Sequence, residues 1–285
     1  MSIVVTGATG HLGRLAVEAL VAAGTDPSTV VAAGRNPERL AELASRHGVR
    51  TAVIDYAEPD TLEAAFAGAD VLLFVSGSEV GRRVAQHTAV IDAAKAVGVG
   101  RVVYTSAPHA DTSELVVNPE HKVTEELLRA SGLTWTILRN NWYTENFAGR
   151  LHEARETGAV VTSTGDGRVA GTTRADYAAG AVAAVLGDGH ENRVYELSGD
   201  VAWTFDDFAA AASELLGVPV VHRDASPDEQ LALLREAGLD EGLAGFFVTV
   251  DHDIARGDLA DATDDLRTLL GRPTTPLADA LRALV

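Results

Sequence analysis

The feature that most constrains the fold of this chain is a regular alternation of two patterns between residues 2 and 138. Short runs rich in β-branched residues recur, and stretches rich in alanine and leucine with helical spacing separate them. Strands that alternate with helices in this way form a parallel sheet covered by helices, and strands covered on both faces are continuously apolar. The sequence therefore predicts an α/β fold. The expected strands are Ile3–Thr6, Thr29–Ala33, Thr51–Ile54, Val71–Val75, Arg101–Thr105 and Thr134–Leu138.

Glycines at a regular spacing follow the first expected strand, in the segment Thr6-Gly7-Ala8-Thr9-Gly10-His11-Leu12-Gly13. In a dinucleotide-binding turn the first glycine permits the tight bend, the second admits the pyrophosphate and the third lets helix and strand pack closely. The N–H groups and dipole of the following helix favour the anion. A Rossmann-type, doubly wound parallel sheet is therefore predicted; a glycine-rich turn without a ligand is the alternative. The expected cofactor contacts here are Gly7, Thr9, Gly10, His11, Leu12 and Gly13.

The pattern changes after Asn140, where helices become dominant. We predict an NADP(H)-binding Rossmann core over residues 1–140 and a smaller, mainly helical, substrate-side lobe over residues 141–285, some segments of which return to the core. The elements expected in the second part are a helix over 143–157, a strand over Ala159–Thr162, a helix over Ala175–Leu186, a strand over Arg193–Leu197, and helices over Phe205–Leu216, Pro227–Ala237, Leu239–Thr249, Asp264–Leu270 and Leu277–Leu284.

The residue after the second strand indicates which nicotinamide cofactor is preferred. An NAD-selective site places an acid there to accept the ribose hydroxyls, but this chain has Arg35. A guanidinium can bind a 2′-phosphate bidentately and stack on adenine. The sequence therefore favours NADP(H) over NAD(H), with a surface arginine at a helix start as the alternative.

Two further strand ends are expected to contact the cofactor. Asp55 and Tyr56 end the third strand, where a carboxylate commonly accepts a hydrogen bond from the adenine amino group. Val75, Ser76 and Gly77 end the fourth, where small residues let the backbone pass along the ribose. Simple turns are the alternative at both places.

Composition excludes several classes of site. The chain has no cysteine, so disulfides, thiolate metal sites and a cysteine nucleophile are ruled out. His109 and Asp111 lie close in sequence, as do Asp251, His252 and Asp253, but neither group has a matching third ligand. We interpret both groups as surface loop residues and predict no metal site.

The start of the chain and its net charge indicate where the protein is located and which partners it can bind. A strand pattern occupies the first five residues with no secretory signal before it, and no apolar run approaches the roughly 20 residues of a membrane span. A cytoplasmic protein is therefore expected. A net charge of −18 repels phosphate backbones and anionic membranes, so neither nucleic acid nor membrane is an expected partner. A homodimer is left open.

Besides Thr6–Gly13, the chain carries the motifs Arg35-Asn36-Pro37, Ser78–Arg82, His109–Ser113, Leu138–Asn146, Thr173–Tyr177, Val194–Leu197 and Pro273–Leu277. These motifs resemble those of NmrA-like, atypical short-chain dehydrogenases/reductases, and the resemblance covers essentially the whole chain. Within that family the bacterial NADPH:quinone oxidoreductases are the most similar group, and triphenylmethane reductase is next. Asn141 is a departure, because those quinone reductases tend to have glycine there; they also carry an apolar residue near Lys122.

The chemistry of ordinary short-chain dehydrogenases is missing from this chain. Those enzymes use Tyr-x-x-x-Lys, in which the lysine lowers the pKa of the tyrosine for proton transfer to a carbonyl oxygen. None of the five tyrosines here has a lysine four residues later. Quinone reduction is less demanding, because a weak donor or water can protonate the stabilised product and positioning supplies most of the catalysis.

Residues at the later strand ends are candidates for the reaction itself. Ser106 follows the fifth strand and can face the nicotinamide, and His121, which resembles a histidine of the family, can orient a ligand or donate a proton near neutral pH. Asn140 ends the sixth strand, where its amide can hold the nicotinamide or a quinone oxygen. Turn, helix-terminus or core roles are the alternatives. The expected acceptor-side residues are Asn141, Trp142, Tyr143 and Arg174.

The sequence therefore predicts an NADPH-dependent oxidoreductase that transfers hydride directly to a quinone or a similar planar, electron-poor acceptor, without flavin or metal. Two alternatives stay open: an NADP(H)-binding redox sensor of the NmrA type that acts through a protein partner, and a reductase of a dye, imine or activated alkene. The aromatic residues beside Asn140 favour an enzyme, because a sensor needs no acceptor pocket.

Overall fold

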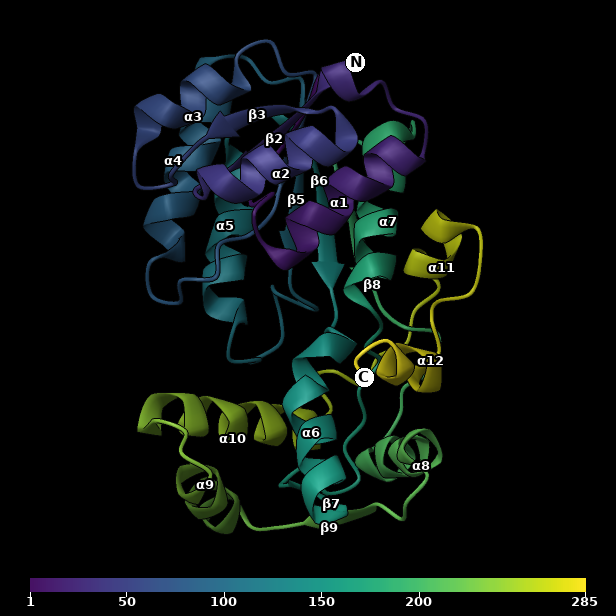
Figure 1. Cartoon of the computed structure of the whole chain (residues 1–285). Coiled ribbons are helices and arrows are strands. Elements are labelled where there is room, and N and C mark those ends of the chain that lie inside the picture. Colours follow the sequence, from purple (N-terminus) through teal and green to yellow (C-terminus); the bar gives the residue numbers. More distant parts are fainter. The chain divides into compact units, whose positions relative to one another are not determined.

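The computed structural model describes all residues from Met1 to Val285 and contains a seven-stranded parallel sheet (Figure 1). The strand order is β3-β2-β1-β4-β5-β6-β8, so the direction of winding reverses between β1 and β4. In such sheets ligands bind outside the carboxyl ends of the strands at this switch point. The predicted α/β, Rossmann-type fold is confirmed. The strands are β1 (Ile3–Val5), β2 (Val30–Gly34), β3 (Arg50–Val53), β4 (Val71–Phe74), β5 (Arg101–Ser106), β6 (Thr134–Asn140) and β8 (Arg193–Leu197).

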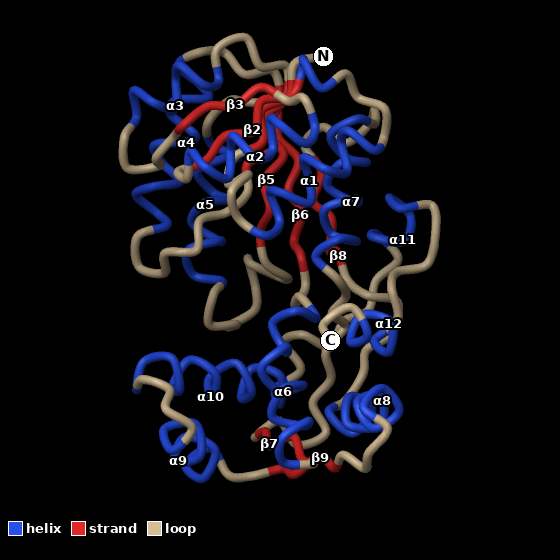
Figure 2. The backbone as a smooth tube through the Cα atoms, in the orientation of Figure 1, coloured by secondary structure: helices blue, strands red, loops and turns tan.

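Six helices cover this sheet, and they fall into two groups (Figure 2). The first group is α1 (His11–Ala22), α2 (Pro37–His47) and α7 (Arg174–Leu186), in which α1 packs against both α2 and α7. The second is α3 (Pro59–Phe66), α4 (Arg83–Ala96) and α5 (Asn118–Ala130), in which α4 packs against both neighbours. The core between strands and helices is apolar, with β1, β2 and β4 buried along their whole length.

The chain divides into two compact units. Residues 1–111, 117–140 and 174–196 form the first unit, which contains the seven-stranded sheet, and residues 112–116, 141–173 and 197–285 form the second. The helices of the second unit are α6 (Ala148–Thr157), α8 (Phe205–Leu216), α9 (Pro227–Glu236), α10 (Glu241–Arg256), α11 (Asp265–Leu270) and α12 (Leu277–Arg282).

A small parallel sheet lies in the second unit, where β7 (Ala159–Thr162) pairs with β9 (Val221–Asp224). The β7 strand was expected from the sequence, but β9 was not. Its segment Val-His-Arg-Asp has only one apolar residue, and that residue, Val221, is 60% exposed. Because β9 lies at an edge and buries little, it lacks the apolar pattern that marks a strand. The β9 segment is a strand because it pairs with β7, which lies about sixty positions earlier in the sequence.

Some helix boundaries also differ from the expected ones. The helix expected over Leu239–Thr249 is α10, which begins after the N-cap Asp240 and runs to Arg256, where Gly257 ends it with a left-handed φ of 89°. The helix expected from residue 143 begins at Ala148, because a 3₁₀ turn over Thr144–Phe147 precedes it.

Asp251 and Asp253 were expected to be surface loop residues, and this is wrong. Both lie in α10 and are at most 1% exposed. The carboxylate of Asp251 accepts hydrogen bonds from Arg150 at 2.5 Å and from the backbone N–H of Ser163 at 3.2 Å. A buried carboxylate needs such partners, so Asp251 stabilises the second unit.

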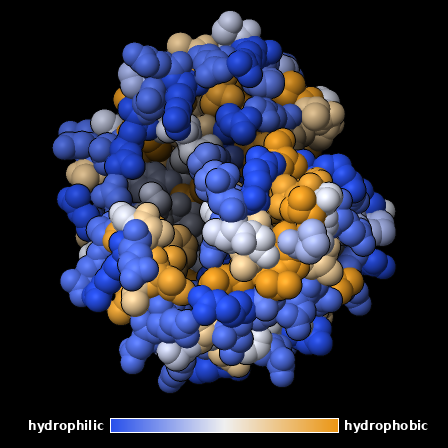
Figure 3. Space-filling model, turned by 60° about the horizontal axis from the view of Figure 1, so that its bottom comes forward, coloured by the Kyte–Doolittle hydropathy of each residue, from blue (hydrophilic) through white to orange (hydrophobic).

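Hydrophilic side chains dominate the face drawn in Figure 3, and hydrophobic side chains form smaller patches on it. This agrees with a composition in which 22% of residues are charged. None of the helices has both the length and the apolar character needed to cross a bilayer.

Candidate cofactor and acceptor site

The glycine turn between β1 and α1 is tightly folded. Gly7 has a left-handed φ of 62°, and the Gly10 N–H donates to the Gly7 carbonyl at 2.9 Å. A Cβ atom on Gly13 would lie 2.3 Å from the Gly7 carbonyl oxygen, so only glycine lets α1 start this close to the turn. Gly10 is the N-cap of α1, without a capping side chain, and the first turn contains no acid. The N–H groups of this turn therefore suit a bound anion.

The other residues predicted at this turn differ in their exposure. Leu12 is buried and contributes to the packing of α1, whereas His11, the first residue of the helix, is exposed. Thr9 is half-buried beside β2, since a Cβ on Gly34 would meet the Thr9 side chain at 2.8 Å. Leu12 is thus available to a cofactor only through its backbone.

Arg39 lies beside the turn and was not predicted. Its Nη1 donates to the Thr9 carbonyl at 2.9 Å, and its backbone N–H donates to the Asn36 side chain that caps α2. Arg39 is exposed, as is Arg35 at the end of β2. The turn therefore has two guanidinium groups near it. The sequence did contain a signal for Arg39: it lies three residues after the N-cap Asn36, in the first turn of α2, which follows the end of β2.

Arg35 is engaged by an acid that the sequence analysis also missed. Its Nη1 lies 2.5 Å from Glu79 Oε1, and the other Glu79 oxygen accepts hydrogen bonds from Gln86 at 3.2 Å and Arg82 at 3.3 Å. The hydrogen bond from Arg35 lowers the pKa of the Glu79 carboxyl, with Gln86 adding to the effect. Since the Arg35 side chain is 59% exposed, water screens this pair and a phosphate can compete for the guanidinium.

Asp55 and Tyr56 both make hydrogen bonds within the protein just after β3. Asp55 Oδ1 accepts from the Ala57 N–H at 2.9 Å, which is a local turn. The Tyr56 hydroxyl donates to the Val75 carbonyl at 2.8 Å and lies 2.7 Å from Thr6 Oγ1, so it ties the ends of β1, β3 and β4 together. Burial raises the pKa of Tyr56 well above its ordinary value. The Tyr56 hydroxyl therefore stabilises the fold through these two hydrogen bonds.

The backbone after β4 is held by side chains from β1, β5 and α4. The Val75 N–H donates to Thr6 Oγ1 at 3.1 Å, and the Ser76 N–H donates to Thr105 Oγ1 at 3.0 Å. The Gly77 N–H donates to His87 Nε2 at 3.0 Å. A cofactor passing this segment would therefore meet carbonyl groups and small side chains, because the N–H groups are occupied.

His121 does not have the properties of a proton donor near neutral pH, so that prediction is wrong. The side chain is buried, and its Nδ1 lies 2.7 Å from the Tyr104 hydroxyl. Burial, together with the nearby charge of Arg83, lowers the pKa of His121 to about 3, so its imidazole is neutral at pH 7. The spacing on α5 did not reveal that this residue faces the sheet.

The buried histidines predict a loss of stability in acid. The pKa of His87 is also lowered to about 3 by burial, from an ordinary 6.5. Since the unfolded chain binds these protons and the folded chain does not, stability is full above pH 6.5 and falls as the pH drops toward 3. At pH 5 each histidine is expected to lower the free energy of unfolding by about 2 kcal/mol.

Denaturant midpoints at pH 7 and pH 5 measure this loss. A His87→Gln variant keeps an acceptor for Gly77 and is expected to lose about half of the pH dependence. Equal pH dependence in the variant and the unmodified protein would contradict the assignment.

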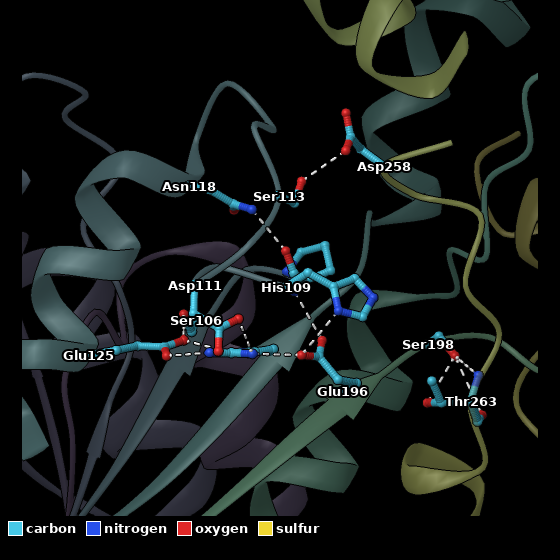
Figure 4. A network of polar contacts seen from close by, with 12 residues as sticks. Ser106, His109, Asp111, Ser113, Asn118, Glu125, Glu196, Ser198, Asp258 and Thr263 are labelled. Atoms are coloured by element: carbon cyan, nitrogen blue, oxygen red, sulfur yellow. Dashed lines mark hydrogen bonds and ion pairs between the residues drawn. The ribbon is translucent and has the colours of Figure 1, made fainter. Parts of the chain in front are cut away.

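Ser106 belongs to a buried charge network at the carboxyl ends of β5 and β6 (Figure 4). Its hydroxyl donates to Glu125 Oε1 at 2.6 Å. Arg139 donates to both oxygens of the same carboxylate, at 2.9 and 2.7 Å, and lies 2.8 Å from each of Glu196 and Asp111. Burial opposes the charge of Arg139, but its three carboxylate partners raise its pKa. The Ser106 hydroxyl is thus used to hold Glu125.

Asn140 and Asn141 are adjacent in sequence but differ in role. Asn140 is the buried last residue of β6, at the edge where Ser106 pairs in register with Arg139. Asn141 is buried in the second unit, where its amide donates to the Leu259 carbonyl at 3.2 Å and accepts from the Trp142 N–H at 2.6 Å. The oxygen and the nitrogen of the Asn141 amide each hold the backbone, and its role in binding the acceptor stays a prediction.

The remaining acceptor-side candidates are half-buried. Trp142 follows Asn141, and Tyr143 forms an isolated parallel bridge with Thr172. Arg174 is the first residue of α7 and is also half-buried. The structure therefore gathers Ser106 and Asn140 at the sheet edge of the first unit, and Asn141 to Tyr143 in the second.

Comparison with known proteins identifies the family. A family model described as NAD(P)H-binding matches residues 7–188. Quinone oxidoreductase 2 of Escherichia coli is 42% identical over 99% of this chain and 98% of its own length. Its crystal structure with NADPH superposes with a TM-score of 0.94 over 99% of both chains. An NmrA-like oxidoreductase of Aspergillus flavus is 32% identical over 100% of this chain and 95% of its own length.

The chain belongs to the NmrA-like NAD(P)H-binding family. The resemblance stated from the sequence is therefore confirmed. A crystal structure of Citrobacter triphenylmethane reductase with NADP(H) is also similar, with 36% identity, full coverage of both chains and a TM-score of 0.94. The family model includes the glycine turn, Arg35 and the strand ends up to Asn140, so every predicted cofactor contact of this NmrA-like protein lies in the matched segment.

Proposed function

We propose that this NAD(P)H-binding protein is an NADPH-dependent reductase that transfers hydride to a quinone or a similar planar, electron-poor acceptor. The observation that carries the proposal is its full-length likeness, at 42% identity and a TM-score of 0.94, to an NADPH-dependent quinone oxidoreductase. A homodimer stays a prediction.

The residues of the first unit suit NADPH. The glycine turn leaves no room for side chains at Gly13, and the uncapped first turn of α1 suits the pyrophosphate. Arg35 and Arg39 would hold the 2′-phosphate, and the small residues Ser76 and Gly77 would flank the ribose. NADPH supplies the hydride when it is bound; the protein supplies position and charge.

The tyrosines support an acceptor that needs no phenolic acid. Tyr104 and Tyr177 are buried and Tyr56 is partly buried, and burial raises the pKa of Tyr56 and Tyr104. None of the five is followed by a lysine four positions later. An electron-poor quinone accepts hydride without such a dyad, whereas an ordinary ketone does not.

A triphenylmethane dye is the second candidate acceptor, because the similar Citrobacter enzyme is a triphenylmethane reductase. Oxidation of NADPH by the purified protein, followed by its absorbance with a panel of quinones and dyes, separates the candidates. Turnover with quinones at higher kcat/KM supports the proposal, and faster turnover with dyes supports the second candidate. Tight NADPH binding without turnover would favour the NADP(H) sensor.

Arg35→Ala is expected to weaken NADPH binding about 10- to 100-fold and to leave NADH binding nearly unchanged, because only NADPH carries the 2′-phosphate. Titration of the protein with each nucleotide, followed by the change in nucleotide fluorescence, measures both affinities. Arg14→Ala, which removes an exposed arginine from α1, is the control. Equal losses for the two nucleotides would remove Arg35 from the 2′-phosphate site.

A further inference from the structure

His109 has a backbone conformation that non-glycine residues rarely adopt. It lies in the loop after β5 with a left-handed φ of 49°, and Asn192 is the other non-glycine residue with a positive φ. Such a conformation costs about 1–3 kcal/mol and persists only where neighbouring contacts impose it. Conformations of this kind cluster at functional sites.

The contacts that impose this conformation come from the charge network of Ser106. Glu196 Oε2 accepts from the His109 N–H at 3.1 Å, and Arg139 in turn holds Glu196. The Asn118 side chain donates to the Pro108 carbonyl at 2.9 Å. Since Ser106 and Asp111 are also tied to this network, the loop over 106–111 is fixed at both ends.

One carboxylate, that of Glu196, lies beside the His109 imidazole. Glu196 Oε1 lies 3.5 Å from His109 Nδ1, and Figure 4 shows the other ring nitrogen turned away from Glu196. Glu196 on β8, Asp111 in the loop and Glu125 on α5 face Arg139 and Arg129. Glu196 thus links the His109 ring to a network of three carboxylates and two guanidinium groups.

His109 differs from the other candidate donors in access to solvent. Its side chain is 32% exposed, whereas Ser106 and His121 are buried and hydrogen-bonded within the fold. The loop also lies at the carboxyl ends of β5, β6 and β8, where ligands bind in such sheets. Imidazole is the side chain whose ordinary titration lies closest to neutral pH.

We propose that His109 is the general acid of the reaction, donating a proton from Nε2 to an oxygen of the quinone. This proposal rests on the proposed function. The quinone gains the hydride of NADPH, with its two electrons, and the proton of His109; NADPH becomes NADP⁺, and the quinone becomes the hydroquinone. Water then returns a proton to the exposed imidazole. Glu196 and Arg139 are positioning residues, because they act through His109.

His109→Asn is the decisive variant, because asparagine tolerates the left-handed conformation but has no acidic proton to give. We expect kcat with a quinone to fall about 100-fold, the affinity for NADPH to stay within about twofold, and added imidazole to restore turnover. We also expect the loss of kcat at high pH in the unmodified protein to flatten in the variant. His152→Asn, at an exposed position on α6, is the matched control and should leave all four quantities unchanged.

The outcomes separate this proposal from the one it rests on. If the unmodified protein reduces quinones and His109→Asn retains kcat and its pH profile, the general acid is not His109 and the reductase proposal stands. If the variant loses turnover but imidazole gives no rescue and the pH profile is unchanged, His109 is structural. If the unmodified protein reduces no quinone, both proposals fail.

Discussion

Arg139→Met is expected to lower the free energy of unfolding by about 3 kcal/mol, because removing the main partner of a buried carboxylate leaves much of its charge uncompensated. Glu125 is fully buried, and Arg139 supplies two of the three hydrogen bonds that it accepts from guanidinium groups; the third comes from Arg129 at 3.0 Å, on the partly exposed side of α5. Methionine keeps much of the volume of arginine, so packing contributes little to the loss. The shift of the urea midpoint at constant slope measures the effect.

The control for Arg139→Met is Arg14→Met on α1. That arginine also pairs with a glutamate, Glu18 at 2.6 Å, but its side chain is 48% exposed. An exposed pair of this spacing contributes about 0.3–0.5 kcal/mol, so the control should change the midpoint little. Similar shifts in the two variants would mean that the buried network contributes no more than a surface pair.

Gly13→Ala is expected to weaken NADPH binding by about 100-fold and to lower the free energy of unfolding by about 1–3 kcal/mol. Its Cβ would lie 2.3 Å from the Gly7 oxygen, 2.6 Å from the Gly7 carbon and 2.9 Å from the Ala8 nitrogen. All three are backbone atoms, so α1 has to move away from the turn and its N–H groups leave the pyrophosphate position.

Two other glycine variants serve as comparisons for Gly13→Ala. A Cβ on Gly10 would lie 3.2 Å from the Gly7 oxygen, so Gly10→Ala should lower the free energy of unfolding less than Gly13→Ala. A Cβ on Gly149, inside α6, would meet nothing within 4 Å, so Gly149→Ala should stabilise the protein by up to about 1 kcal/mol. NADPH titration and urea unfolding report on all three. Undiminished NADPH affinity in Gly13→Ala would remove this turn from the cofactor site.

The sheet could be predicted from the sequence because its strands carry their own signal. Strands buried on both faces, such as β4 with Val-Leu-Leu-Phe, are apolar throughout. The glycine turn was equally visible, since its spacing follows from backbone geometry within one local segment. Strand β9 shows the opposite case, because its pairing with β7 leaves it exposed and polar.

Side-chain roles were predicted less well, because they depend on partners far away in sequence. Glu79 pairs with Arg35 across 44 positions, and Asn141 donates to Leu259 across 118. His121 has the same local surroundings whether α5 turns it toward the sheet or toward water. Burial decides whether its imidazole is charged, and burial is a property of the assembled fold.

The path of the chain between the two units has a consequence for biosynthesis. Helix α7 and strand β8 belong to the first unit but are made after residues 141–173, which belong to the second. Because α1 packs against α7, a nascent chain that has released only its first 140 residues exposes an apolar flank of α1. Folding on the ribosome therefore cannot close the nucleotide-binding half before residue 196 emerges, and early folding intermediates should attract chaperones to that flank.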